Sequence, residues 1–290
     1  MAGIIDLIGN TPMVELKKLN PNPNVTIYAK LEGNNPGGSV KDRASLNMIR
    51  SALERGDIKP GTKLIEATSG NTGIALAMIA RLFDLEIELV LPANSTRERT
   101  LTMEAFGGKV TLLDGIEACR DYAEAKAATG EYFLLNQFAN PDNYLAHVKT
   151  TGPEIWRDTE GKITHFVSAM GTTGTIMGCS TYFKEKNNNI RIVGCQPTEG
   201  SSIPGIRRWP EEYLPKIFDP SKVDEVRDVS QDEAVATTRQ LAKQEGIFAG
   251  MSSGGAAAAS IKLASELKEG VIVFICCDRG DRYLSSDLFG

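Results

Sequence analysis

The chain alternates short apolar segments with longer segments of helical periodicity, and this alternation restricts its fold more than any other feature. Strands are expected at residues 26–30, 63–67, 86–91, 109–113, 165–170, 191–196 and 271–276. Helices are expected at residues 42–55, 72–82, 96–106, 116–129, 174–185, 231–245 and 254–267. Strands separated by helices pair in parallel and need helices on both faces of the sheet. The sequence therefore predicts an α/β fold with mostly parallel sheets.

Lys41 lies near the end of a turn-rich segment, Gly-Asn-Asn-Pro-Gly-Gly-Ser-Val-Lys-Asp-Arg, at residues 33–43. This segment ends in what resembles the first turn of a helix, so the amine is held at a fixed and sheltered point. Shelter from water disfavours the ammonium form, and a neutral lysine can attack a carbonyl to form a Schiff base. Most lysines near a helix start are simply exposed, so this interpretation depends on support from other motifs.

A second glycine-rich segment, Thr-Ser-Gly-Asn-Thr-Gly at residues 68–73, connects an expected strand to an expected helix. The free backbone N–H groups at the start of such a helix, with the helix dipole behind them, suit an anion. Thr68, Ser69 and Thr72 add hydroxyl groups, and a substrate carboxylate is the natural ligand. The same residue types also favour an ordinary capped turn, and at this point both interpretations stay open.

A third segment, Gly-Thr-Thr-Gly-Thr at residues 171–175, follows the strand at 165–170 and opens the next helix. A strand, a glycine loop and a helix in this order form the usual geometry of phosphate sites. The segment matches neither the dinucleotide-binding pattern nor the P-loop with its lysine. It therefore favours a small phosphate ester over a nucleotide.

Together, the lysine, the phosphate loop and the carboxylate loop describe a site for pyridoxal phosphate. This cofactor also needs a partner for its pyridine nitrogen, and Ser252, in the Gly-Met-Ser-Ser-Gly-Gly segment at 250–255, is the candidate. A helix N-cap explains Ser252 equally well. A serine would leave the nitrogen neutral, which disfavours a long-lived carbanion and favours β-elimination and β-replacement over transamination.

These segments resemble the fold-type II pyridoxal phosphate enzymes, specifically the cysteine synthases (O-acetylserine sulfhydrylases). The resemblance extends from Ile-Gly-Asn-Thr-Pro at residues 8–12 to Cys-Asp-Arg-Gly at residues 277–280, and residues 199–210 and 277–283 resemble the B type. It implies two three-layer αβα domains of the kind seen in the tryptophan synthase β chain. Residues 37–145 would form a smaller, mobile, substrate-binding domain. Residues 1–36 and 146–290 would form the larger domain, which binds the cofactor phosphate.

The resemblance also implies a role for each candidate residue. Lys41 would carry the cofactor and act as general base, Asn71 would contact the 3-oxygen of the cofactor, and Ser252 would contact its pyridine nitrogen. The phosphate would be held by Gly171, Thr172, Thr173, Gly174 and Thr175. The substrate carboxylate would be held by Thr68, Ser69, Gly70, Thr72 and Gln137. Arg207 and Cys277 would border the place where the sulfur donor adds.

The implied reaction is a β-replacement that makes L-cysteine from O-acetyl-L-serine and sulfide through an aminoacrylate intermediate. Thiosulfate would yield S-sulfocysteine, and a protein thiocarboxylate is a third donor that the sequence leaves open. The alternatives are a cystathionine β-synthase, a serine/threonine dehydratase, or a non-catalytic partner protein with the same fold. The presence of Lys41, Asn71 and Ser252 argues against the last alternative.

Composition restricts the partners and the compartment. The 290 residues carry a net charge of −5 without a basic run, which argues against nucleic acid. Five cysteines without a CxxC motif favour a reducing compartment, the cytoplasm, and two histidines give no metal site. We expect no signal peptide and no membrane contact, because no apolar stretch is long enough to span a bilayer. A homodimer is implied by the resemblance.

Overall fold

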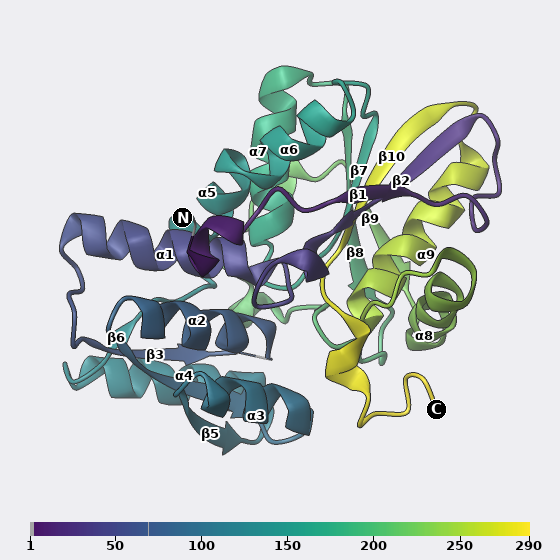
Figure 1. The fold of residues 1–290 in the computed structure, drawn as a ribbon. Coiled ribbons are helices and arrows are strands. Elements are labelled where there is room, and N and C mark those ends of the chain that lie inside the picture. The colour runs from purple at the N-terminus through teal and green to yellow at the C-terminus, as the bar shows by residue number, and fades with distance from the viewer. Residues whose placement is uncertain (1–2, 69) are drawn as a thin grey trace.

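The structure is a computed structural model that describes residues 3–68 and 70–290, and its strands form two separate sheets (Figure 1). The larger sheet has the order β1-β2-β10-β7-β8-β9, formed by Met13–Glu15, Val25–Leu31, Gly270–Cys276, His165–Ala169, Arg191–Pro197 and Glu225–Val229. The smaller sheet has the order β5-β4-β3-β6, formed by Lys109–Leu113, Glu86–Pro92, Lys63–Ala67 and Phe133–Leu134. All neighbours run parallel except β1 and β2, which confirms the predicted α/β fold with mostly parallel sheets.

Helices cover both faces of the smaller sheet. These are α1 (Lys41–Arg55), α2 (Asn71–Leu82), α3 (Arg97–Ala105) and α4 (Gly115–Ala128). Alternate side chains of a strand point to opposite faces, so Leu64 and Leu89 pack with α1 and α2, whereas Ile65 and Val90 pack with α4. Figure 1 shows α2 and α4 on opposite sides of β3. The smaller sheet is thus the middle layer of an αβα arrangement.

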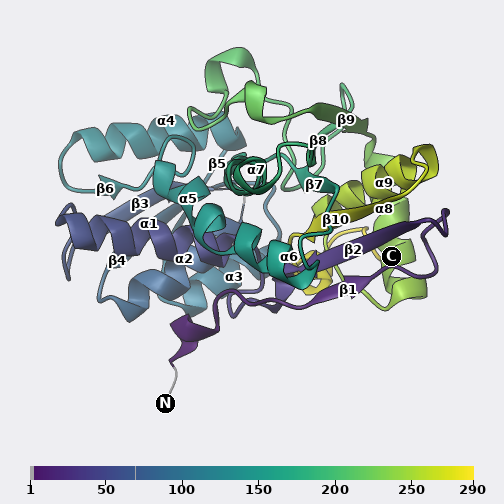
Figure 2. The ribbon, with the colours of Figure 1, turned by 90° about the horizontal axis from the view of Figure 1, so that it is seen from above.

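The larger sheet is covered in the same way. Its helices are α6 (Thr151–Asp158) and α7 (Gly174–Lys186) on one face, and α8 (Gln231–Gln240) and α9 (Met251–Glu266) on the other. The neighbouring residues Val273 and Phe274 of β10 face α7 and α9 respectively. The remaining helix, α5 (Pro141–Lys149), contacts both α1 and α7. Figure 2 shows α5 and α7 where the two halves of the molecule meet.

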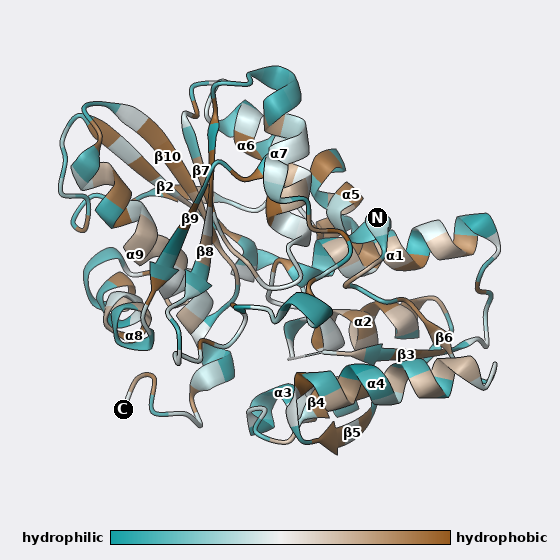
Figure 3. Cartoon of the chain, turned by 180° about the vertical axis from the view of Figure 1, so that it is seen from behind, coloured by the Kyte–Doolittle hydropathy of each residue, from teal (hydrophilic) through white to brown (hydrophobic). Residues whose placement is uncertain are grey.

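Several elements were not predicted from the sequence, namely β1, β6, β9, α5 and α6. The strand β9 lies at the edge of the larger sheet, and its sequence Glu-Val-Arg-Asp-Val is mostly polar. Figure 3 shows this contrast, with β9 hydrophilic and the central strand β10 hydrophobic. The predicted helix at 231–245 is also divided, because α8 ends at Gln240 and a π-helix continues from Leu241 to Glu245.

A second correction to a predicted helix concerns α9, which begins at Met251 rather than at residue 254. Gly254 and Gly255, which open the predicted helix, therefore lie inside the observed one, although glycine weakens a helix interior. The structure gives a packing reason for the first of them. A side chain at Gly254 would collide with Thr238 and with the carbonyl of Ala234 on α8. Glycine is therefore required here for close helix contact, and it does not mark a loop.

The smaller sheet comes entirely from residues 63–134, which lie inside the predicted domain of residues 37–145. The two boundaries of that domain remain a prediction, and the second falls within α5. None of the helices in the described part of the chain is long and apolar enough to cross a membrane.

Candidate active site

Lys41 is the first residue of α1, and the chain just before it is attached to the end of β10. The N–H of Val40 donates to the carbonyl of Cys277 at 2.9 Å. Burial lowers the pKa of the Lys41 ammonium, although the nearby Cys277, Asp278 and Glu32 partly oppose this effect. The positive end of the α1 dipole also disfavours a cation at this position. The structure therefore favours a Lys41 amine that loses its proton easily.

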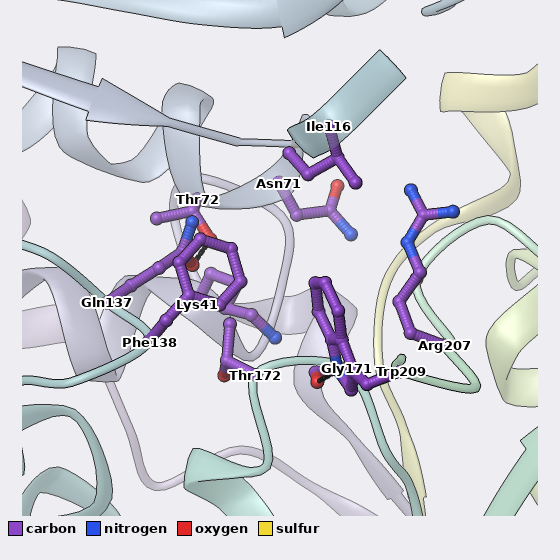
Figure 4. Close-up of a pocket in the computed structure, with 11 residues that line it drawn as sticks. Lys41, Asn71, Thr72, Ile116, Gln137, Phe138, Gly171, Thr172, Arg207 and Trp209 are labelled. Carbon is purple, nitrogen blue, oxygen red and sulfur yellow. Dashed lines mark hydrogen bonds between the residues drawn. The ribbon is translucent and has the colours of Figure 1, made fainter. Parts of the chain in front are cut away.

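Lys41 faces a pocket that contains side chains from both halves of the molecule (Figure 4). This pocket is lined by Lys41, Asn71, Thr72, Ile116, Gln137, Phe138, Gly171, Thr172, Gly205, Arg207 and Trp209. An adjoining pocket shares Lys41, Asn71, Gly171, Thr172 and Gly205 with it and adds Thr173, Gly174, Thr175, Ser252 and Cys277. Among the residues that the structure describes, every candidate from the sequence therefore lines one pocket or the other, apart from Thr68 and Gly70.

The segment at residues 171–175 runs from just after β7 into the first turn of α7 and has the features of an anion cradle. Thr173 adopts a left-handed conformation with φ of +69°, and its buried Oγ1 has no hydrogen-bond partner within the described residues. A side chain at Gly174 would collide with the carboxamide of Asn143, and one at Gly171 would lie 2.8 Å from the carbonyl of Gly205. The first turn of α7 adds N–H groups without intrahelical partners. An unpaired hydroxyl beside free amides fits a phosphate group.

Ser252 lies in the first turn of α9, close to Cys277. The Cys277 thiol donates to the carbonyl of Ile275 at 3.7 Å, and the N–H of Cys277 donates to the Ser253 hydroxyl at 2.9 Å. Burial raises the pKa of the Cys277 thiol to about 11, so the thiol is neutral at neutral pH. The preceding residue, Cys276, is the last residue of β10 and is buried in the core. This wall of the site therefore presents neutral groups.

On the opposite wall, Thr72 and Gln137 are joined. The Thr72 hydroxyl donates to Gln137 Oε1 at 2.7 Å, and Gln137 Nε2 donates to the carbonyl of Ala67 at 2.7 Å. The backbone N–H of Gln137 donates to the carboxyl group of Glu66 at 3.0 Å. Burial raises the pKa of Glu66 to about 8, although the backbone N–H groups of Gln137 and Asn136 oppose the shift. Glu66 thereby fixes the segment that carries Gln137.

The remaining residues of the predicted carboxylate loop are placed differently. Thr68 is buried, and its hydroxyl oxygen accepts the N–H of Gly70 at 3.0 Å, which is the turn contact that the alternative interpretation expects. Gly70 has φ of +141°, and a side chain there would collide with Arg99. The predicted contact through Ser69 lies outside the described residues.

The segment between β8 and β9 crosses the outside of the pocket. Its Trp209 donates the indole N–H to the carbonyl of Gly171 at 2.7 Å and packs edge to face against Phe138, with ring centroids 5.5 Å apart. The guanidinium of Arg120, on α4, lies 4.5 Å from the centre of the Phe138 ring and donates to the carbonyl of Tyr213 at 2.8 Å. These contacts attach the segment to both sides of the pocket.

Sequence reasoning missed four residues that line the pocket, Ile116, Phe138, Gly205 and Trp209. Gly205 and Trp209 lie in the same motif as Arg207, so the motif itself contained a signal. Phe138 follows Gln137, and nothing in the sequence singled out Ile116. Arg207 is partly buried at the rim, where burial lowers the pKa of its guanidinium.

Burial lowers the pKa of both histidines. Burial and the charge of Arg43 lower the pKa of His147 to about 3, and its Nδ1 lies 2.8 Å from the Thr151 hydroxyl. Burial also lowers the pKa of His165, which lies on β7. Within residues 3–68 and 70–290, no group of three His, Cys, Asp or Glu side chains is arranged to hold a metal ion.

The comparisons with known proteins agree with this geometry. Residues 4–278 match the family model described as "Pyridoxal-phosphate dependent enzyme". The chain is 57% identical to cysteine synthase B of Pseudomonas aeruginosa, over 99% of this chain and 97% of that protein. It is 56% identical to cysteine synthase B of Escherichia coli, over 100% of this chain and 97% of that protein.

Among solved structures, the cysteine synthase of Entamoeba histolytica superposes with a TM-score of 0.92 at 37% identity, covering 100% of this chain and 90% of that chain. The resemblance drawn from the motifs and the prediction of pyridoxal phosphate as cofactor are thereby confirmed. The chain belongs to the fold-type II pyridoxal-phosphate dependent enzymes and, within them, to the cysteine synthases.

Proposed function

We propose that this enzyme makes L-cysteine from O-acetyl-L-serine and sulfide, with Lys41 and the loop at residues 171–175 holding pyridoxal phosphate between them. The observation that supports this most directly is the position of Lys41. Burial lowers the pKa of its amine, and Lys41 lines two adjoining pockets together with residues of the phosphate cradle. The relatives named cysteine synthase B match the chain over nearly its whole length, and their name states the synthesis of cysteine.

The residues of the two pockets divide the work. The loop at residues 171–175 would hold the phosphate of the cofactor, and Ser252 and the Asn71 amide would hold its ring, at the pyridine nitrogen and the 3-oxygen respectively. The cofactor supplies an electron sink for the negative charge that develops at the substrate α-carbon. The Nζ atom of Lys41 removes the α-proton, because a neutral amine beside the substrate acts as a general base. The lowered pKa of Lys41 supports this role.

The substrate carboxylate binds, in this proposal, at the loop of residues 68–72 together with Gln137. Gln137 and Thr72 line the pocket and are hydrogen-bonded to each other, which supports the proposal that both take part in binding the carboxylate. Because this loop and Lys41 belong to the predicted mobile domain of residues 37–145, carboxylate binding would draw that domain toward the larger one and expel water.

The sulfur donor enters past Arg207 and Cys277. Arg207 brings a cation to the rim of the pocket, and the neutral Cys277 thiol is small. A guanidinium and a compact neutral neighbour together suit an anionic donor, so we include thiosulfate, with S-sulfocysteine as its product, among the reactions of this enzyme.

The proposal also covers the assembly and the compartment. All five cysteines are free in the described structure, which supports a reducing compartment such as the cytoplasm. Ile4 and Leu82 are exposed apolar side chains that line one surface hollow. A second copy of the chain that covers such apolar surface would form the homodimer that the resemblance implies.

Two measurements test the function. Lys41→Ala should abolish both turnover and the visible absorbance of the bound cofactor, and retained turnover would contradict the assignment. For the donor, Arg207→Met should raise the KM for thiosulfate about tenfold and leave the KM for sulfide nearly unchanged, because only thiosulfate is a dianion. The matched control is Arg208→Met, since Arg208 pairs with Asp228 at 2.6 Å away from the pocket. An equal rise in KM for thiosulfate and for sulfide would refute the proposal that Arg207 selects the donor.

A further inference from the structure

The side-chain amide of Asn71 is held between two opposite charges. Its Nδ2 donates to Asp278 Oδ2 at 2.7 Å, and its Oδ1 accepts from Arg282 Nη1 at 2.6 Å. Asn71 begins α2, beside the smaller sheet, whereas both charged residues lie on the segment that follows β10 of the larger sheet. The contact therefore joins the two halves of the molecule at the active site.

Both charged groups are themselves fixed in place. Asp278 is only 1% exposed and accepts a second hydrogen bond from the Tyr283 hydroxyl at 2.7 Å. Arg282 is 9% exposed and also donates to the carbonyl of Gly37, in the turn that leads to Lys41. The carbonyl of Arg282 accepts the Thr96 hydroxyl at 3.0 Å. The carboxylate and the guanidinium are thus held by partners of their own.

This arrangement selects one orientation of the Asn71 amide. A carboxylate only accepts hydrogen bonds and a guanidinium only donates them. Rotating the amide by half a turn would set its NH₂ group against the Arg282 guanidinium and its oxygen against the Asp278 carboxylate. Both contacts would be repulsive, so the nitrogen stays beside Asp278. That nitrogen carries two N–H groups, and Asp278 receives one of them.

We propose that Asp278 and Arg282 are positioning residues, which turn the second N–H of Asn71 toward an acceptor oxygen on the cofactor ring. This inference rests on the contact between Asn71 and the cofactor proposed above. The amide projects into the same pocket as the Lys41 amine (Figure 4), whereas neither Asp278 nor Arg282 lines the two adjoining pockets. A donor at that ring oxygen favours its anionic form, so the pair also tunes the cofactor absorbance.

The first test compares two arginines of one segment. Arg282→Met is titrated with pyridoxal phosphate, and both the affinity and the visible band of the bound cofactor are recorded. The affinity should fall about tenfold and the band should shift, because a charge-assisted hydrogen bond that orients the amide is lost. Arg279→Met is the matched control, since Arg279 is exposed and pairs with Asp281 at 3.4 Å. An unchanged affinity and band in Arg282→Met would overturn the proposal.

A double-mutant cycle separates positioning from a merely structural role. In an Asn71→Ala background, Arg282→Met should cause no further change in affinity or band, because the group that it orients is absent. An equal effect in both backgrounds would refute the proposal. Asn71→Ala alone tests the underlying contact: if it leaves the cofactor band unchanged, the contact with Asn71 is wrong as well.

A changed band in Asn71→Ala together with an unchanged band in Arg282→Met would contradict only the positioning role. Thermal unfolding of each variant without cofactor shows whether the chain still folds. Where Arg282→Met fails to fold, Asp278→Asn keeps the size of the side chain and removes the charge. It should shift the band in the same direction, and an unshifted band would count equally against the proposal.

Discussion

Replacing Glu154 by Gln should destabilise the protein strongly, because it removes a negative side chain that pairs with two buried cations, Arg43 and Lys30. Glu154 accepts from Arg43 at 2.7 and 2.8 Å and from Lys30 at 2.9 Å, and its side chain is 7% exposed. It also accepts the N–H of Asn10 at 2.9 Å. Glutamine keeps the size of the side chain and one acceptor, so the change mainly removes charge.

The magnitude follows from the acidity of Glu154. Burial by itself raises the pKa of this carboxyl, but Arg43, the Asn10 N–H and Lys30 together lower it from 4.5 to about 2. The difference, 4.5 − 2 = 2.5 pKa units, corresponds to roughly 3 kcal/mol at 1.36 kcal/mol per unit. Removing one partner of a buried ion pair costs about 3–5 kcal/mol of stability, which agrees with this figure. We therefore expect Glu154→Gln to lose about 3 kcal/mol of unfolding free energy at pH 7.

The pH dependence gives an independent check of the sign. Because the pKa of Glu154 is lower in the folded state, its contribution is fully present above pH 4.5 and is lost as the pH falls toward 2. The difference in unfolding free energy between wild type and Glu154→Gln should therefore become smaller as the pH falls from 4.5 toward 2.

Urea unfolding followed by circular dichroism measures both effects. The matched control is Glu160→Gln, since Glu160 is 76% exposed and pairs with an exposed Lys162, so its stability should match wild type. A loss below about 1 kcal/mol, or a difference that does not change with pH, would refute the reasoning.

Three further changes test other parts of the structure. Glu66 has a raised pKa of about 8, so its contribution to stability is present below pH 4.5 and is lost as the pH rises through 8. The Tm of the wild type should therefore fall as the pH rises over that range, and the Tm of Glu66→Gln should fall less. Gly174→Ala would collide with Asn143 and should lower the affinity for pyridoxal phosphate about tenfold in a titration, and an unchanged affinity would argue against the cradle. Arg120→Met removes the cation over Phe138 and should speed tryptic cleavage of the segment between β8 and β9; an unchanged digestion rate would show that Arg120 does not hold this segment.

The parts of the site that could be predicted are those formed by residues close together in the sequence. The phosphate loop was recognisable because its glycines and hydroxyls are needed by the backbone itself, with Thr173 in a left-handed conformation and no room for a side chain at Gly174. The strands and helices that flank it were predictable from their hydrophobic periodicity. Lys41 could be proposed for the same reason, since it follows a turn-rich segment at a helix start.

The parts that could not be predicted depend on tertiary packing. Asn71 contacts Asp278 and Arg282 across the two halves of the molecule, and no periodicity relates residues so far apart in the sequence. Ile116 reaches the pocket only because α4 covers one face of the smaller sheet. At Gly254, close contact with α8 overrides the poor helix propensity of glycine.

The strand order of the larger sheet has a consequence for how the chain folds during its synthesis. The early strand β2 pairs in parallel with the final strand β10, so that Val25 lies opposite Gly270. The larger sheet therefore cannot close until residues 270–276 have left the ribosome, whereas the smaller sheet is complete once residue 134 has emerged. In the interval, β2 lacks its partner strand β10, and an unpaired strand edge of this kind favours pairing with other chains.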